Sequence, residues 1–269
     1  MSDDRPTEAF PTREYPPAAA PAPRKKRRGL RVLLWILIPV VLIVALVVVA
    51  DGVLRSYAEG RVASEIEKNF PSDVSGDVTV HIGGLSVIQQ YLKGSFDTVQ
   101  LEAPKLTVNG SPVDASVVAS GVPIDSSKPV KSITGTLGVS QASLNKLVQI
   151  PGATGDITLG SGVLGYDGRI DLLGLPVGYT VKTKPQAAGS TVLLQPVSAS
   201  LKTGAGSVDL SRLLNAVTAR GPFPICAAQY LPKGVDVSGI TIVPGHATVR
   251  LTAQDFVLDE ATLRSKGSC

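Results

Sequence analysis

The pattern in the sequence that most resembles a catalytic or cofactor motif is a glycine-rich loop. Gly160, Gly162 and Gly165 match the pattern G-x-G-x-x-G in the segment GSGVLG. In dinucleotide-binding proteins this loop opens a helix whose N-terminal amides bind a pyrophosphate. Here the segment that follows, YDGRIDLLGLPVGYTV, is interrupted by Gly and Pro and is typical of strands and turns. We therefore expect a hairpin loop at this position and no bound cofactor.

Other catalytic and metal-binding patterns are also missing from the sequence. The two histidines, His81 and His246, lie in separate strand-like stretches, so they form neither an HExxH motif nor a Cys/His cluster for zinc. The nucleophile motif GxSxG does not occur. Acidic residues are numerous but scattered. The sequence therefore predicts a protein that is not an enzyme and holds no metal.

The charge of the chain is concentrated at its N-terminus. Residues 1–31 contain eight Lys and Arg against four acidic residues, so they account for the whole net charge of +4. The remainder is neutral and produces no broad positive field for phosphates, which excludes nucleic acid as a partner. Residues 1–29 are rich in Pro and Ala and are expected to be a disordered basic tail.

A long apolar segment follows this tail. Residues 32–50 contain no charged side chain, and residues 30–50 would extend ~31 Å as a helix, enough to cross a bilayer. The basic segment RKKRRGLR precedes it, which predicts a cytoplasmic N-terminus and a domain of residues 51–269 outside the cytoplasm. The alternative is a signal peptide cleaved after Ala50, since Val48 and Ala50 are small, but the apolar run is longer than the usual ~7–15 residues. We expect the segment to be retained as an anchor in the cell membrane.

The expected location outside the cytoplasm bears on the state of the two cysteines. Cys226 lies in the segment GPFPICAAQYLP and Cys269 is the last residue of the sequence. In an oxidising compartment the simplest prediction is a disulfide between them. The alternatives are a lone reactive thiol, which no nearby His or CxxC spacing supports, and an intermolecular bridge through Cys269.

The body alternates between helix-like and strand-like patterns. Apolar residues recur every four positions from Leu54 to Phe70, which predicts a stalk or the first helix of the fold. The segments DVTVHI, YTVKTK, VLLQPVSASLK and ATVRLTA alternate as strands with one buried face do. Short amphipathic helices are expected near residues 85–92, 144–148 and 210–217. The predicted class is α+β, with a mostly antiparallel sheet and the helices packed on its buried face.

Two interpretations of this aliphatic body remain open. Short amphipathic helices over a one-sided sheet are compatible with an apolar groove for an acyl chain. They are equally compatible with a filled core, which is the simpler interpretation of periodicity alone. A protein with a filled core would be a non-catalytic envelope scaffold or protein-interaction domain. An enzyme acting on lipid-linked sugars is a third alternative, for which the sequence offers no recognisable motif.

The order of the motifs resembles the LmeA-like family of actinobacterial cell-envelope phospholipid-binding proteins. The basic tail and apolar span come first, followed along residues 53–260 by DVTVHIGGLSVIQQYLKGSFDTVQLEAP, NGSPVD, VSQASLNKLV, VDLSRLLNAV and LPKGVDVSGITIVPGHATVRLTAQDFVL. The resemblance implies a curved sheet around helices, similar to the tubular lipid-binding (BPI-like) folds, with phospholipid in an apolar cavity. It also implies a role in envelope maintenance or lipoglycan mannan elongation. The expected partners are phospholipid and the membrane, and no protein partner is indicated.

Under this interpretation the apolar faces of the short helices line the cavity, and the residues around Cys226 form its mouth or lid. The predicted lipid-binding residues are Leu85, Ile88, Leu92, Leu144, Leu147, Val148, Leu213, Leu214, Val217, Phe223, Ile225 and Tyr230, with Leu231 beside them.

Overall fold

A computed structural model describes residues 28–148, 154–172, 175–203, 206–210 and 221–269. The predicted lipid-binding residues Leu213, Leu214 and Val217 therefore lie outside the described residues. The chain divides into two compact units, Met1–Val47 and Val48–Cys269. The described part of the first unit is entirely helical.

Helix α1 (Arg28–Lys68) contains the apolar segment and continues into the second unit. Among the described residues it is the one helix long and apolar enough to cross a membrane, with a mean hydropathy of 3.3 over its most apolar 18-residue stretch, although a signal sequence has the same properties. The sequence left open whether residues 54–70 form a stalk or the first helix of the fold, and the structure continues the apolar segment into them as one helix without a break at Asp51 or Gly52. The helix ends shortly before Pro71, because a residue that precedes proline disfavours the helical conformation.

The end of α1 belongs to the second unit and packs within it. Ala63, Ile66 and Phe70 contact a buried cluster that includes Val80 and Ala103. Of the apolar residues that recur from Leu54 to Phe70, only those at the end of the helix therefore form a packing face, while Leu54 and Val62 are exposed.

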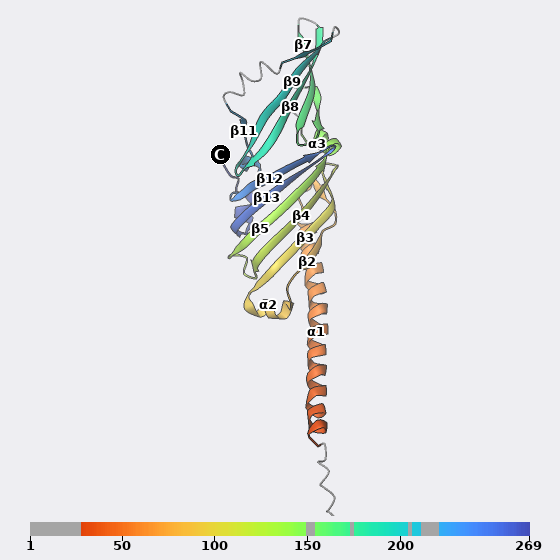
Figure 1. The fold of residues 1–269 in the computed structure, drawn as a ribbon. Helices are drawn as coiled ribbons and strands as arrows, with labels where there is room; N and C mark the ends of the chain where they lie inside the picture. The colour runs from red at the N-terminus through yellow and green to blue at the C-terminus, as the bar shows by residue number, and fades with distance from the viewer. Residues whose placement is uncertain (1–27, 149–153, 173–174, 204–205, 211–220) are drawn as a thin grey trace, which may run out of the picture. The chain divides into compact units, whose positions relative to one another are not determined.

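The second unit contains two antiparallel sheets (Figure 1). The first has the strand order β1-β3-β4-β5-β13-β12, with β2 also paired to β3. Its strands are β1 (Val74–Ser75), β2 (Thr79–Ile82), β3 (Ser95–Val108), β4 (Ser111–Pro123), β5 (Pro129–Ser140), β12 (Val235–Val243) and β13 (His246–Val257). The second has the order β10-β9-β8-β7-β6, with β11 also paired to β9. Its strands are β6 (Thr154–Leu159), β7 (Leu164–Leu172), β8 (Leu175–Ala188), β9 (Thr191–Thr203), β10 (Gly206–Asp209) and β11 (Phe223–Cys226).

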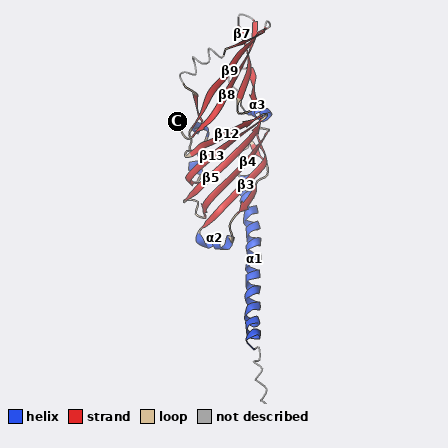
Figure 2. Ribbon diagram, viewed as in Figure 1, coloured by secondary structure: helices blue, strands red, loops and turns tan. Residues whose placement is uncertain are grey.

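Short helices complete the described part of this unit. They are α2 (Val87–Lys93), α3 (Gln141–Leu147), the 3-10 turn η1 (Ala228–Tyr230) and α5 (Glu260–Arg264). Figure 2 shows how strongly strands predominate over helices. The α+β class and the antiparallel sheets are confirmed, and both sheets are open. The predicted hairpin at Gly160 is also confirmed, since Gly160 N–H donates to Val163 O between β6 and β7.

The first sheet has one apolar face, which we call the inner face. Residues directly opposed in antiparallel strands lie on the same face, so the strand registers define rows across it. The four rows, read across β3, β4, β5, β13 and β12, are Val99-Ala119-Ile133-Ala253-Val235, Leu101-Val117-Gly135-Leu251-Val237, Ala103-Ala115-Leu137-Val249-Ile240 and Leu106-Val113-Val139-Ala247-Ile242. The alternate positions on β4 and β5, including Ser116, Thr134 and Thr136, form the polar outer face.

Two β-bulges keep these rows apolar. In β3 the register shifts between Ala103 and Leu106, and in β12 it shifts between Val237 and Gly239. Without the first bulge Lys105 would take the next inner position, because side chains alternate between the faces. The bulge places Leu106 there instead.

The inner face continues toward the second sheet. Ile157 and Leu159 of β6 form one buried cluster with Ile242 and Ala247, and Leu144 of α3 packs against it. Helix α3 is held beside β6 because the Asn145 side chain both accepts from Ile157 N–H (2.6 Å) and donates to Ile157 O (2.9 Å).

Candidate lipid-binding site

An apolar cavity of about 410 Å³ lies against the inner face of the first sheet. None of its described lining residues is charged, and Thr252 is the only one with a polar side chain. Five strands supply the wall: β3 (Leu101), β4 (Val117, Ala119), β5 (Ile133, Gly135), β12 (Val235) and β13 (Leu251, Thr252, Ala253, Phe256). Such a wall can hold hydrocarbon but offers no charged partner for a phosphate.

Gly135 creates space in the middle of the wall. It lies between Val117 and Leu251 in a row whose other members have larger side chains. A Cβ atom placed on Gly135 would lie 3.8 Å from Val117 Cγ2 and 3.9 Å from Leu251 Cβ, at ordinary contact distance. The glycine is therefore required neither by its backbone conformation nor by a close approach, and its main structural effect is the empty volume.

The remaining lining residues come from segments outside the sheet. Ile66 is contributed by α1, and Pro232, Leu258 and Leu263 come from the segments around η1 and α5. Helix α5 begins at Asp259, whose carboxylate accepts from Thr262 N–H at 2.6 Å. Hydrogen bonding from the Thr262 side chain, and then from its backbone N–H, lowers the pKa of Asp259, as expected for a carboxylate that caps a helix.

The C-terminal segment is fastened beside the cavity. Cys226 and Cys269 form the predicted disulfide. Lys233 N–H donates to Ser265 O, and Gly267 N–H donates to the carbonyls of Ala228 and Leu231. Gly267 has no room for a side chain, because a Cβ atom would lie 2.8 Å from Ala228 Cβ. These contacts hold the segment that carries Leu263.

The described members of the predicted lipid-binding set lie elsewhere. Leu85 and Leu92 are exposed around α2, where Ile88 is half-buried. Leu144 packs between the sheets, Leu147 is half-buried and Val148 is exposed. Phe223, Ile225 and Tyr230 are exposed on β11 and η1. None of these described residues lines the apolar cavity, and their contact with lipid stays a prediction.

The strand residues that line the cavity carried a signal in the sequence. Val99, Leu101 and Ala103 alternate with polar residues, as do Val249, Leu251 and Ala253. This alternation identifies an apolar face, but it does not distinguish a face that borders a cavity from one that is covered by packed side chains.

A larger hollow, of about 630 Å³, lies over the second sheet. Its lining includes Asp156, Asp167, Arg169 and Lys202. Burying hydrocarbon against these charges would remove them from water, which costs several kcal/mol for each unpaired ion. This hollow is therefore unsuited to an acyl chain. Within the part of the chain that the structure describes, no group of three His, Cys, Asp or Glu could hold a metal ion.

Comparison with known families identifies the chain. The model of the LmeA-like phospholipid-binding family matches residues 49–252. The chain belongs to this family. The match extends from α1 to β13 and includes most of the cavity wall, and it confirms the resemblance seen in the sequence. Neither the curated proteins nor the solved structures contain a match.

Membership of the LmeA-like family supports phospholipid as the ligand. The family's description is one of binding and not of catalysis. A scaffold protein is expected to have a filled core, whereas this structure has a cavity beside Gly135.

Proposed function

We propose that this protein is a membrane-anchored phospholipid-binding protein that holds acyl chains in the cavity against the inner face of the first sheet. The observation that carries the proposal is the cavity wall, whose described residues offer aliphatic and aromatic side chains and no charge. Its volume lies within the range of ~300–1,000 Å³ that is typical of small-molecule sites.

The energetics favour exchange with a bilayer over binding from water. Each CH₂ group that leaves water for the cavity contributes ~0.8 kcal/mol. A chain that leaves a bilayer gains little, because lipid tails are as apolar as leucine side chains. The cavity can therefore take up and release a lipid at a membrane without a large free-energy difference. The uncharged wall predicts that the headgroup stays outside the cavity and contributes little to selectivity.

We further propose that α1 is retained as a single membrane anchor, with a cytoplasmic N-terminus and the sheets outside the cytoplasm. The basic segment before the span supports this orientation, and the disulfide suits an oxidising compartment. In this proposal the two sheets together act as a tubular, BPI-like holder of lipid in cell-envelope or lipoglycan maintenance. Phe223, Ile225 and Tyr230 are proposed as further apolar contacts near the C-terminal segment.

The test is to purify the full-length protein from its own membranes in mild detergent and measure the retained phospholipid by native mass spectrometry. We expect a defined number of phospholipids bound to each chain. A protein that carries no lipid and also extracts none from vesicles would refute the proposal. Co-purification of a stoichiometric protein instead of a lipid would favour the scaffold alternative.

A further inference from the structure

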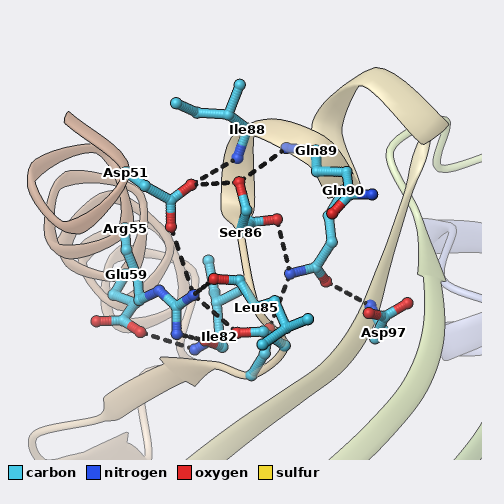
Figure 3. Close-up of polar contacts among 12 residues, drawn as sticks. Asp51, Arg55, Glu59, Ile82, Leu85, Ser86, Ile88, Gln89, Gln90 and Asp97 are labelled. Carbon is cyan, nitrogen blue, oxygen red and sulfur yellow. Dashed lines mark hydrogen bonds and ion pairs between the residues drawn. The ribbon is translucent and has the colours of Figure 1, made fainter. Parts of the chain in front are cut away.

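Three side chains of α1 hold one loop of the second unit (Figure 3). Asp51, Arg55 and Glu59 are spaced four residues apart and so lie on one face of the helix. Asp51 accepts from Ser86 Oγ (2.7 Å) and from Ile88 N–H (3.0 Å). Arg55 donates to Ile82 O (3.0 Å) and Gly84 O (2.9 Å). Glu59 accepts from Ile82 N–H at 2.7 Å, so residues 82–88 are attached along more than two turns of α1.

Helix α2, which follows this loop, is also fixed from its other side. Gln90 is buried and its side-chain amide donates to Gly83 O (2.9 Å) and Ser86 O (3.2 Å). The Gln90 side chain also accepts from Asp97 N–H (2.6 Å) at the start of β3. Gly94 ends α2 in the left-handed conformation (φ 81°) that favours glycine. The loop and α2 therefore form one rigid projection.

This rigid projection presents large apolar side chains to solvent. Leu85 is 96% exposed, Leu92 is 81% exposed and Tyr91 is 63% exposed. The hydrogen bonds hold the backbone in place but leave these side chains in water. Burying one leucine side chain would stabilise the protein by about 1.5–3 kcal/mol, and this stabilisation is not gained within the chain. Exposed apolar groups gathered on an ordered element are typical of an interaction surface.

The position of the projection along the chain indicates what covers it. Asp51 is the first charged residue after the apolar run of residues 32–50, so in an anchored protein it lies at the boundary between membrane and water. Asp51 is hydrogen-bonded to Ser86 and Ile88, so the neighbouring Leu85 also lies near the boundary between membrane and water. Tyrosine with leucine is suited to this depth, because the ring can lie among the headgroups while the aliphatic groups enter the acyl boundary. The exposed Lys93 at the end of α2 is suited to lipid phosphates.

We propose that Leu85, Tyr91 and Leu92 form a second, peripheral attachment that inserts into the bilayer spanned by α1. This inference rests on the anchored form given under Proposed function. The two attachments together fix the orientation of the first sheet to the membrane. Helix α2 leads directly into β3, which supplies Leu101 to the cavity wall, so the attachment keeps that strand close to the source of lipid.

The test places a fluorescent probe on the projection of the full-length protein. Trp35, the single tryptophan, is replaced by phenylalanine, and Leu92→Trp is introduced in that background. The matched control is Val243→Trp, at an exposed apolar position at the end of β12. Each protein is reconstituted into phosphatidylcholine vesicles, with or without bromine on the acyl chains. We expect brominated lipid to quench the Leu92→Trp protein and shift its emission to shorter wavelength, and to leave the Val243→Trp protein unchanged.

Two further variants make the result specific. Leu85→Asp in the Leu92→Trp protein is expected to reduce the quenching, because a charge opposes insertion of the same surface. Gly135→Leu in the Leu92→Trp protein is expected to remove the cavity lipid and keep the quenching. If the Leu92→Trp protein is quenched but no lipid is found in the wild-type cavity, the proposed function is refuted and the second attachment is supported.

Equal emission of the Leu92→Trp protein in brominated and ordinary vesicles would overturn the second attachment, even if cavity lipid were present. Quenching that is just as strong in the Val243→Trp protein would also overturn it. Failure of the chain to float with the vesicles would overturn the anchor and the second attachment together.

Discussion

The substitution Gly135→Leu tests whether the empty volume beside β5 is the lipid site. A Cβ atom at Gly135 fits at 3.8 Å from Val117 Cγ2, so the new side chain can extend into the cavity without moving the strands. Leucine adds four carbon atoms, and burying them contributes up to about 3 kcal/mol when the cavity is otherwise empty. Replacing a glycine inside a strand raises the free energy of unfolding by about 0.5–1 kcal/mol more, because glycine loses more conformational freedom on folding. The lipid-free variant should therefore be more stable than the lipid-free wild type.

Added phospholipid should narrow this difference in stability, because the wild type binds it and the variant does not. A ligand at 100 times its Kd stabilises the protein that binds it by about 2.7 kcal/mol. In a domain of this size each kcal/mol raises Tm by about 2–4 °C. Thermal unfolding in detergent micelles, with and without added phospholipid, should show a lipid-dependent rise in Tm for the wild type and little rise for Gly135→Leu.

The series Gly135→Ala, Gly135→Val and Gly135→Leu should lose bound phospholipid progressively. The matched control is Thr134→Leu, which adds an aliphatic side chain to the outer face of the same strand and should leave lipid binding unchanged. A folded Gly135→Leu protein with the wild-type amount of phospholipid would refute the assignment of the cavity. Loss of lipid in the Thr134→Leu protein to the same extent would show that the effect is not specific to the inner face.

Three further predictions follow from the contacts of the second unit. Replacing both Cys226 and Cys269 by serine should destabilise the protein by about 4 kcal/mol, given the separation of 43 residues, and a loss under about 1 kcal/mol in thermal unfolding would contradict this estimate. The hydrogen bonds from Ile88 and Ser86 lower the pKa of Asp51 from its ordinary value of 3.8, so their stabilisation is present above that value and is lost as pH falls through the lower folded pKa. The protection of the amides of residues 82–93 from hydrogen exchange, measured relative to the intrinsic exchange rate at each pH, should therefore fall in acid for the wild type and change less for Asp51→Asn, and identical pH profiles of protection would exclude this role of the carboxylate. Deleting Ser238, the additional residue of the β12 bulge, should be tolerated, whereas deleting Thr241 should turn Ile242 to the outer face and reduce Tm, and equal effects of the two deletions would contradict the register.

The sequence was sufficient to predict the features that depend on a local pattern of residues. Alternation predicted the one-sided strands, with Val249, Leu251 and Ala253 on one face, as the strand register confirms. The Gly and Pro residues after Gly165 distinguished a hairpin from a cofactor loop. The two cysteines predicted the disulfide, because the chain offered each only one partner within the protein.

The cavity depends on contacts that are distant in sequence. Leu101, Gly135 and Leu251 lie in one row only because β13 pairs with β5 and β5 with β4. A periodic pattern identifies the apolar face of each strand, but it does not determine which strands are neighbours. For the same reason the hydrogen bonds from Asp51 and Arg55 to residues 82–88 could not be predicted.

The amphipathic helices led the sequence-based prediction toward helix residues as the cavity lining. An apolar helix stripe indicates a face that favours removal from water, but it does not show what, if anything, covers that face in the folded chain. Leu144 contacts the cluster between the sheets, whereas Leu92 is exposed on the projection attached to α1. Their shared apolar pattern therefore corresponds to different environments.

The most direct test of whether the cavity holds lipid is to locate a bound acyl chain on the protein. A phospholipid with a photoactivatable group near the end of one acyl chain is incorporated into vesicles with the full-length protein, illuminated, and its adducts are located by peptide mass spectrometry. The structure predicts adducts on inner-face residues of the first sheet, including Val117, Ile133 and Leu251, and their loss in the Gly135→Leu protein. Adducts confined to the apolar segment of α1, or placed on the polar face of either sheet, would contradict the proposal that the cavity holds the lipid.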